Sequence, residues 1–201
     1  MFHLNRETAE DWWEVEALYD LCFAPGREAL SSYRLREDRP PIAALSQVAR
    51  DADGILAGAI RYWPVCIETH TALLLGPIAV HPTRQGEGLG GYLIRESLAL
   101  APGLGWNRVL LIGDAPYYQK FRFRPLSGVE MPPPTNPKRI LGMSLTPGAW
   151  EGVQGQVRSP APRPNSAASK PSANLPAMAR GIFHLYARYS KTLKIFYSRY
   201  F

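Results

Sequence analysis

The stretch that decides the fold is LLLGPIAVHPTRQGEGLGGYLIRESLALA, residues 73–101. Its first part, Leu73–Val80, is an apolar run long enough for one buried strand. Four glycines then fall within residues 86–91, and from Leu89 the apolar residues recur near helical spacing. The stretch therefore predicts a strand, a tight glycine turn and a helix.

A glycine turn directly before a helix is suited to a phosphate. Free backbone N–H groups at a helix N-terminus, reinforced by the helix dipole, form an anion site. Glycines remove the Cβ atoms that would keep a phosphate away, and they permit positive φ. We therefore expect this turn to hold a phosphate or a pyrophosphate.

Two common phosphate motifs fit the turn poorly. A phosphate-loop NTPase needs lysine and then Ser or Thr after the last glycine, whereas tyrosine follows here. A dinucleotide fold needs GxGxxG, which Gly86, Gly88 and Gly91 match, and Asp114 stands near the place of a ribose-binding acid. However, residues 81–85 separate the strand from the first glycine, and the chain soon becomes proline-rich. Both features disfavour a dinucleotide fold.

A third pattern fits two separate stretches. Residues 85–90 carry Gln-x-x-Gly-x-Gly after the strand GPIAVHP, residues 76–82, and this resembles the acyl-CoA loop of the GNAT N-acetyltransferase superfamily. Residues 110–125, LLIGDAPYYQKFRFRP, resemble its second hallmark, a strand, a helix bearing Tyr-Tyr and a Phe-Gly-Phe turn. Two hallmarks in order are more specific than one glycine loop. The resemblance covers about residues 1–157 and is closest to bacterial N-acetyltransferases of unassigned substrate.

The resemblance implies an α/β (α+β) fold, a mixed, splayed β-sheet flanked by helices. The sheet parts after the strand at residues 73–80, and the pantetheine arm of acetyl-CoA fills the gap like an extra strand. The main chain of Ile78 and Val80 then bonds pantetheine, the turn amides hold the pyrophosphate, and Gln85 steadies the loop. The implied cofactor-binding residues are Ile78, Ala79, Val80, Gln85, Gly86, Glu87, Gly88, Leu89, Gly90 and Gly91.

Two charged side chains of the turn are expected to play smaller parts. The Glu87 carboxylate has the wrong sign for a phosphate ligand and should face water. The Arg84 side chain is either a cation near a phosphate or a solvated loop charge.

The implied reaction is direct transfer of acetyl from acetyl-CoA to an amine acceptor in a ternary complex, without a metal. The amide of Val80 would polarise the thioester carbonyl, and Tyr118 would protonate the leaving thiolate. A tyrosine with an ordinary pKa near 10 can donate at pH 7. The base stays open between Glu68, His70, Glu28 and a water chain, and Tyr117 is expected in the core or the substrate wall.

One residue departs from the family pattern. Arg122 stands where the family usually has glycine, and if that position needs positive φ the arginine is strained by about 1 kcal/mol. The departure keeps a second function class open, a protein that binds acyl-CoA without turnover.

Composition and charge bound the rest. The 201 residues suggest one domain, and the two cysteines lack metal spacing, so a reducing cytoplasm is the default. The start has no signal-peptide h-region, and no apolar run approaches the roughly 18 residues of a membrane span. The net charge of +6 arises in the tail, because residues 159–201 hold seven Lys or Arg and no Asp or Glu.

The chain is expected to divide into an acetyltransferase domain, residues 1–157, and a Pro/Ser/Ala-rich linker with a basic aromatic tail, residues 158–201, poorly ordered. No nucleic-acid partner is expected, and a homodimer stays open. Before and after the central stretch, the patterns predict strands at 2–5, 45–50, 55–67, 108–113 and 140–145, and helices at 12–22, 27–36 and 116–121, and residues 153–157 are expected to end the domain. Pro64 is expected at a bulge or a strand end, and Asp114 as an N-cap.

Overall fold

The computed structural model describes residues 1–161 apart from residues 24, 25 and 38. The predicted basic aromatic tail and nearly all of the linker before it lie outside the described residues. The strands are β1 (His3–Arg6), β2 (Gln47–Arg50), β3 (Leu56–Ile67), β4 (His70–Val80), β5 (Arg108–Ile112), β6 (Arg124–Pro125), β7 (Val129–Glu130), β8 (Ile140–Ser144) and β9 (Gly155–Arg158). The α-helices are α1 (Trp12–Phe23), α2 (Ser31–Arg34), α3 (Leu89–Leu100) and α4 (Ala115–Tyr118).

These strands form one mixed sheet in the order β1-β2-β3-β4-β5-β8-β6, with β9 pairing both β3 and β7. The first four strands are antiparallel neighbours in chain order. β4 and β5 are parallel, and the connection between them is the glycine turn and α3. A turn at residues 51–54 joins β2 to β3.

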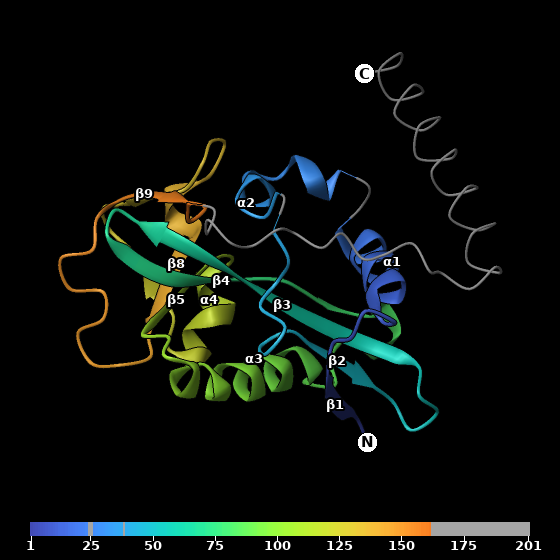
Figure 1. The fold of residues 1–201 in the computed structure, drawn as a ribbon. Coiled ribbons are helices and arrows are strands. Elements are labelled where there is room, and N and C mark those ends of the chain that lie inside the picture. The colour runs from blue at the N-terminus through green and yellow to red at the C-terminus, as the bar shows by residue number, and fades with distance from the viewer. Residues whose placement is uncertain (24–25, 38, 162–201) are drawn as a thin grey trace, which may run out of the picture. The chain divides into compact units, whose positions relative to one another are not determined.

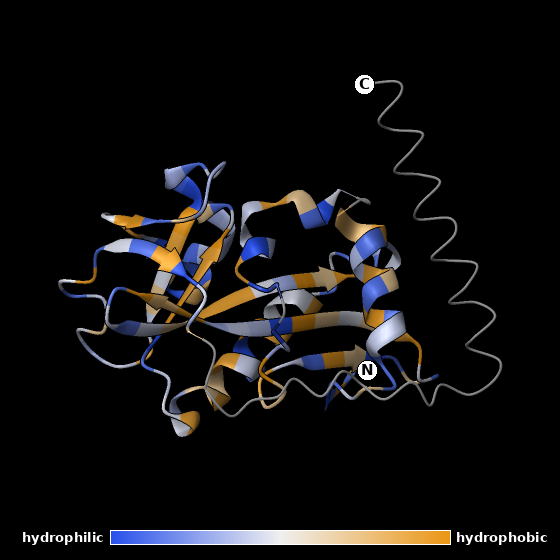
Figure 2. Cartoon of the chain, turned by 45° about the horizontal axis from the view of Figure 1, so that its top comes forward, coloured by the Kyte–Doolittle hydropathy of each residue, from blue (hydrophilic) through white to orange (hydrophobic). Residues whose placement is uncertain are grey.

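Helices cover both faces of the sheet (Figure 1). α3 lies along one face, where Leu93 and Ile94 pack with Ile60 and Tyr62 of β3. α1 and α2 lie on the opposite face (Figure 1). Apolar residues concentrate in the central strands and polar residues in the outer turns (Figure 2), which is the pattern of a sheet buried between two layers.

The sheet parts between β4 and β5. The two strands pair at only two positions, Leu73 with Val109 and Leu74 with Leu110. β4 then continues to Val80 beside β3 alone. This is the splayed sheet that the family resemblance implies.

One local expectation was wrong, and a second was confirmed only in part. Pro64 is neither at a bulge nor at a strand end, but pairs with Leu73 inside the β3–β4 ladder. It is tolerated because β2 pairs with β3 only as far as Ile60 and β9 only from Cys66, so this part of β3 has one free edge. Asp114 occupies the N-cap position of α4, as expected, but its side chain makes no capping hydrogen bond and instead pairs with Arg139 at 3.3 Å.

Within the described residues, no helix combines the length and apolarity that crossing a bilayer requires.

Candidate active site

A bulge in β4 marks the point where the sheet parts. Gly76 and Pro77 lie together opposite Arg61, because the β3–β4 register shifts between Ile60 and Tyr62. Gly76 has a φ of +123°, a conformation that side-chain-bearing residues rarely adopt. Bulges of this kind bend a strand and redirect its peptide groups, and they recur beside active sites.

Beyond the bulge, the main-chain groups of Ile78 and Val80 face the gap. The amide of His81 donates to the carbonyl of Ala57 at 2.8 Å, and in an antiparallel ladder every second residue bonds to the same neighbour. Ala79 therefore bonds to β3, and its side chain is 4% exposed. Of the three predicted strand ligands, the structure presents Ile78 and Val80 to the gap but not Ala79.

The carbonyl of Val80 has partners within the protein. It accepts hydrogen bonds from Gln85 Nε2 at 3.3 Å and from Cys22 Sγ at 3.5 Å. The Gln85 bond ties the glycine turn back to the end of β4. The N–H groups of Ile78 and Val80 are consequently the main-chain donors that point into the gap.

The glycine turn presents a row of free amides. Within the described residues, none of the N–H groups of residues 86–91 donates to a protein acceptor. Gly86 and Gly88 have φ values of +86° and +79°, and a Cβ at either position would meet nothing within 4 Å. The space that a phosphate needs is therefore open in front of these amides, at the N-terminus of α3.

The glycine turn and α4 are in contact, so the two sequence hallmarks form one site. A Cβ on Gly90 would come within 3.0 Å of the Tyr117 hydroxyl, and one on Gly91 within 3.3 Å of the Phe121 ring. These two glycines therefore serve close packing, whereas Leu89 anchors the turn with a side chain that is 2% exposed.

The charged side chains near the turn are partly paired with one another. Arg84 donates to Asp51 at 2.7 Å and lies 3.9 Å from Glu87, so its charge is balanced by the protein. Glu87 is exposed, as expected. A second cation reaches the turn: Arg95 Nη1 is 3.2 Å from the position that a Cβ on Gly91 would take.

Tyr118 lies at the carboxyl end of β5. Its ring occupies the space that a Cβ on Gly113 would need, and it packs edge-on against Tyr117 and Phe123 at centroid distances of 5.0 and 5.8 Å. Burial, with the neighbouring Tyr117 and Asp114, raises the pKa of Tyr118 to about 12. The hydroxyl makes no hydrogen bond within the described residues, so it is a protonated donor with no internal acceptor.

Two of the predicted bases are in the wrong place. Glu68 lies in the turn between β3 and β4, and His70 is the first residue of β4. Val80 is at the other end of the strand, about 33 Å away at roughly 3.3 Å per residue. β4 starts at the hairpin turn that holds Glu68 and ends at Val80, so these two side chains lie at the end of the strand that is far from Val80. The third candidate base, Glu28, lies in the short 3₁₀ helix at Arg27–Ala29 and is exposed.

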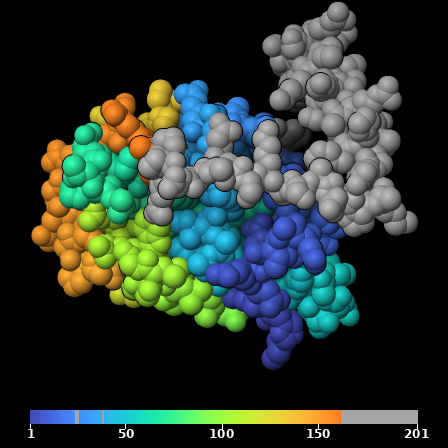
Figure 3. Space-filling view, in the orientation of Figure 1, coloured from blue at the N-terminus to red at the C-terminus, as the bar shows by residue number. Residues whose placement is uncertain are grey.

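The segment that follows α1, with α2, contacts elements on both sides of the gap. In the space-filling view, the light-blue segment that follows α1 lies between the dark-blue N-terminal residues and the orange C-terminal strands (Figure 3). Ser31 of α2 shares a hydrogen bond of 2.6 Å with Thr135 in the proline-rich loop before β8. Ser159, after β9, donates to the carbonyl of Leu35 at 2.7 Å.

Arg122 adopts the left-handed conformation, with a φ of +68° and a ψ of +14°. The backbone therefore keeps the shape that glycine would give it, and Phe121 and Phe123 on either side are buried. The arginine is strained but leaves the turn intact.

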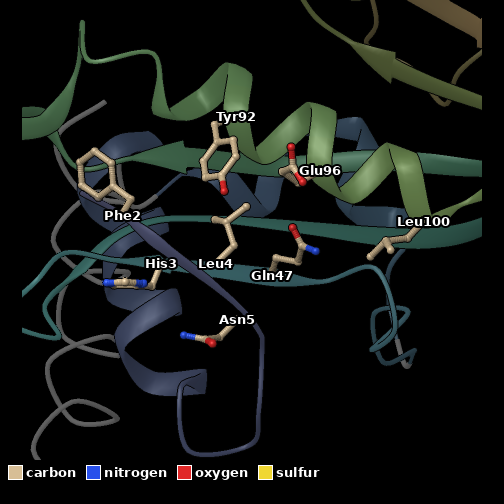
Figure 4. Close-up of a pocket in the computed structure, with 8 residues that line it drawn as sticks. All are labelled: Phe2, His3, Leu4, Asn5, Gln47, Tyr92, Glu96 and Leu100. Atoms are coloured by element: carbon tan, nitrogen blue, oxygen red, sulfur yellow. The ribbon is translucent and has the colours of Figure 1, made fainter.

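A shallow groove lies elsewhere on the described part of the chain. It has a volume of about 430 Å³ between β1, β2 and the outer side of α3, and none of its lining residues is a predicted site residue. In Figure 4, Tyr92 extends from α3 toward Leu4, Phe2 lies to one side of it, and Glu96 faces Gln47. Among the described residues, no group of three or more His, Cys, Asp or Glu side chains is placed to hold a metal ion.

Sequence reasoning missed Arg95 and the placement of Tyr117. Arg95 lies one helical turn after Gly91, and an i, i+4 cation after a glycine turn is a signal that the sequence does contain. The position of Tyr117 over Gly90 depends on how α3 packs against α4, which no local pattern reveals.

A model of the acetyltransferase (GNAT) family matches residues 10–123, more than half of the chain. The uncharacterized N-acetyltransferase YjhQ of Escherichia coli K12 is 33% identical over 132 residues, which cover 63% of this chain and 71% of YjhQ. The uncharacterized N-acetyltransferase YhbS of the same strain is 31% identical over 111 residues, which cover 54% of this chain and 65% of YhbS.

Two solved structures are similar over most of the described residues. The crystal structure of E. coli YhbS in complex with CoA has a TM-score of 0.69 and 26% identity, covering 79% of this chain and 89% of that one. A GNAT acetyltransferase of Brucella melitensis in complex with acetyl-CoA has a TM-score of 0.62 and 30% identity, covering 80% of this chain and 97% of that one.

Proposed function

This chain belongs to the acetyltransferase (GNAT) family, and from that premise we propose that it transfers acetyl from acetyl-CoA to an amine acceptor in a ternary complex. The observation that carries the proposal is the open edge of β4 next to free turn amides. Both lie where an extended acyl-CoA molecule would need them, and two relatives were crystallised with CoA or acetyl-CoA.

The acyl donor fits the chain's own donors. The amides of residues 86–91 and the N-terminus of α3 suit the pyrophosphate, and Arg95 adds a nearby positive charge. The N–H groups of Ile78 and Val80 suit two carbonyl oxygens of the acylated pantetheine arm, one of them that of the thioester, and the arm would lie along β4 as a strand neighbour.

The chemistry follows from the same placement. The amine nitrogen attacks the thioester carbonyl carbon, whose oxygen accepts a hydrogen bond from the Val80 amide. The new C–N bond forms, the C–S bond breaks, and the thiolate takes a proton from the Tyr118 hydroxyl. The ammonium proton leaves to water, and Tyr118 is reprotonated from solvent. No side chain is assigned as the base.

Both cysteines, Cys22 and Cys66, are free thiols. This supports a reducing compartment, and we place the enzyme in the cytoplasm as part of the proposal.

Thiol release with DTNB across a panel of amines, beside calorimetry with acetyl-CoA, tests the function. We expect acetyl-CoA to bind and CoA thiol to appear only when an acceptor is added. Binding of acetyl-CoA without thiol release from any amine would favour the alternative, an acyl-CoA-binding protein without turnover. Failure of acetyl-CoA to bind would exclude both.

A further inference from the structure

Arg36 lies where the sheet parts. It follows α2, and its Nη2 is 3.6 Å from the position that a Cβ on Gly76 would take. Gly76 lies just beyond Leu73 and Leu74, the two β4 residues that pair with β5. The neighbouring Leu35 packs with Trp63 and Leu74 in the layer on the face opposite α3. The guanidinium therefore reaches the gap from the α1 and α2 side, opposite the helix whose N-terminus suits the acyl donor.

Two other arginines on this face have acidic partners. Arg27 donates to Asp20 at 2.6 Å and to Glu16. Arg61 donates to Glu16 at 2.5 Å and to both carboxylate oxygens of Glu7. Both guanidinium groups are thus compensated inside the protein.

Arg36 has no such compensation. Its Nε and Nη1 are buried and have no hydrogen-bond partner within the described residues. Its Nη2 makes one long hydrogen bond, of 3.4 Å, to the Ser32 hydroxyl. The rings of Tyr33 and Trp63 lie 4.6 and 5.0 Å from the guanidinium carbon. The two rings hold the group in place, and a hydrogen bond with the Tyr33 side chain also favours the charged form, but neither replaces an acidic partner.

A buried, unpaired guanidinium is costly, and a native structure needs a reason to keep it. Burial, together with the neighbouring charge of Arg27, lowers the pKa of Arg36 to about 10, so the group is still charged at pH 7. The planar fork of arginine matches the two oxygens of a carboxylate or a phosphate. A held, charged fork with free donors beside the gap is therefore a place for an oxyanion.

We propose that Arg36 binds the carboxylate or phosphate of the acceptor, so that the acceptor is an amine that also carries an acidic group. This inference rests on the proposed function, because it names the class of molecule that enters the same gap. Arg36 is then a specificity-determining residue: it selects the acceptor and leaves acetyl-CoA binding to the other face.

Pairs of amines that differ only in the acid test the proposal. We would use lysine with cadaverine, phenylalanine with 2-phenylethylamine, histidine with histamine, and phosphoethanolamine with ethanolamine. Each is titrated by calorimetry into the CoA-saturated protein and assayed for thiol release with acetyl-CoA. At least one acidic member should bind 10-fold or more tightly than its neutral partner, and the last pair separates phosphate from carboxylate.

Two variants and one control locate the effect. Arg36→Gln should remove the preference for the acidic member by raising its KM about 10-fold or more, with the acetyl-CoA Kd unchanged. Arg36→Lys keeps the charge but not the fork, and should bind the acidic member several-fold more weakly than the unsubstituted protein. Arg34→Gln changes an exposed arginine two residues earlier, at the end of α2, and should alter neither constant. Because Arg36 is unpaired, its removal should not lower the melting temperature.

The outcomes separate the inference from the function. Acid-selective binding that Arg36→Gln abolishes, without thiol release, would support the inference and refute catalysis. Thiol release from neutral and acidic amines alike would support catalysis and overturn the inference. An acid preference that survives Arg36→Gln would also overturn it. If Arg36→Gln fails to fold, an unchanged preference in Arg36→Lys would overturn it instead.

Discussion

At the scale of single residues, Tyr118 offers the most direct test of the proposed chemistry. Tyr118→Phe removes the hydroxyl and keeps the ring contacts with Tyr117 and Phe123. We expect kcat to fall about 100-fold, the range for a lost general acid, with the acetyl-CoA Kd unchanged. Because the pKa of Tyr118 is raised to about 12, the hydroxyl stays protonated below that pH. The kcat profile should therefore show no alkaline decline from this residue below about pH 11.

Tyr117→Phe is the matched control for that experiment, since it changes the adjacent tyrosine of the same helix. Its hydroxyl lies over Gly90 rather than at the end of β5, so kcat should change little. Stopped-flow thiol release for both variants would decide the assignment. Equal losses in the two variants would argue against a specific role for Tyr118.

Arg122 offers a second test at this scale, of backbone strain. Arg122→Gly should stabilise the protein by about 1 kcal/mol, or roughly 2–4 °C in melting temperature, because glycine adopts the observed φ of +68° without strain. Arg122→Ala removes the same side chain but keeps the strain, and should give no such gain. A gain in alanine equal to that in glycine would point to the side chain instead.

At the scale of elements, the glycine turn separates conformational strain from ligand binding. Gly88→Ala and Gly54→Ala change two glycines with the same φ of +79° and open space around the missing Cβ. Both variants should therefore lose about 1 kcal/mol of stability. Only Gly88→Ala should weaken acetyl-CoA binding, about 10-fold or more, because its methyl group enters the space before the turn amides. Chemical denaturation and calorimetry on the pair measure the two effects separately.

The elements also show which parts of the site can be predicted from sequence. The strand, turn and helix of residues 73–100 were predicted because their signals are local: an apolar run, glycines at a turn and helical spacing. Glu68 and His70 were misplaced because their distance from the gap depends on the direction in which β4 runs, from the hairpin turn to Val80, and residue type does not reveal that direction. Arg36 was missed because its lack of an acidic partner becomes apparent only in the structure, where Arg27 and Arg61 pair with Glu16 and Asp20 of α1 and with Glu7.

At the scale of the whole molecule, the boundary of the functional unit can be set by truncation. A chain ending at residue 161 retains the hydrogen bond of Ser159 to Leu35 and the contact of Pro160 with Arg39, which hold the segment after α2. It should bind acetyl-CoA as the full chain does. A chain ending at residue 157 loses both contacts next to Arg36, and should bind the acceptor more weakly and melt at a lower temperature. Thermal melting and the amine titrations check both lengths, and equal behaviour of the two would contradict the prediction.

The parted sheet has one more consequence, for solubility. Bare peptide groups on the rim of a sheet can recruit a strand from another molecule and start aggregation. Here the bare groups of Ile78 and Val80 belong to a strand in the middle of the order, with β3 on one side and β5 beginning the other half. A foreign sheet cannot approach edge-on from within that crevice, although a single slender chain can enter it. The unpaired peptide groups are therefore accessible to a single extended ligand but not to the sheet of another copy of the protein.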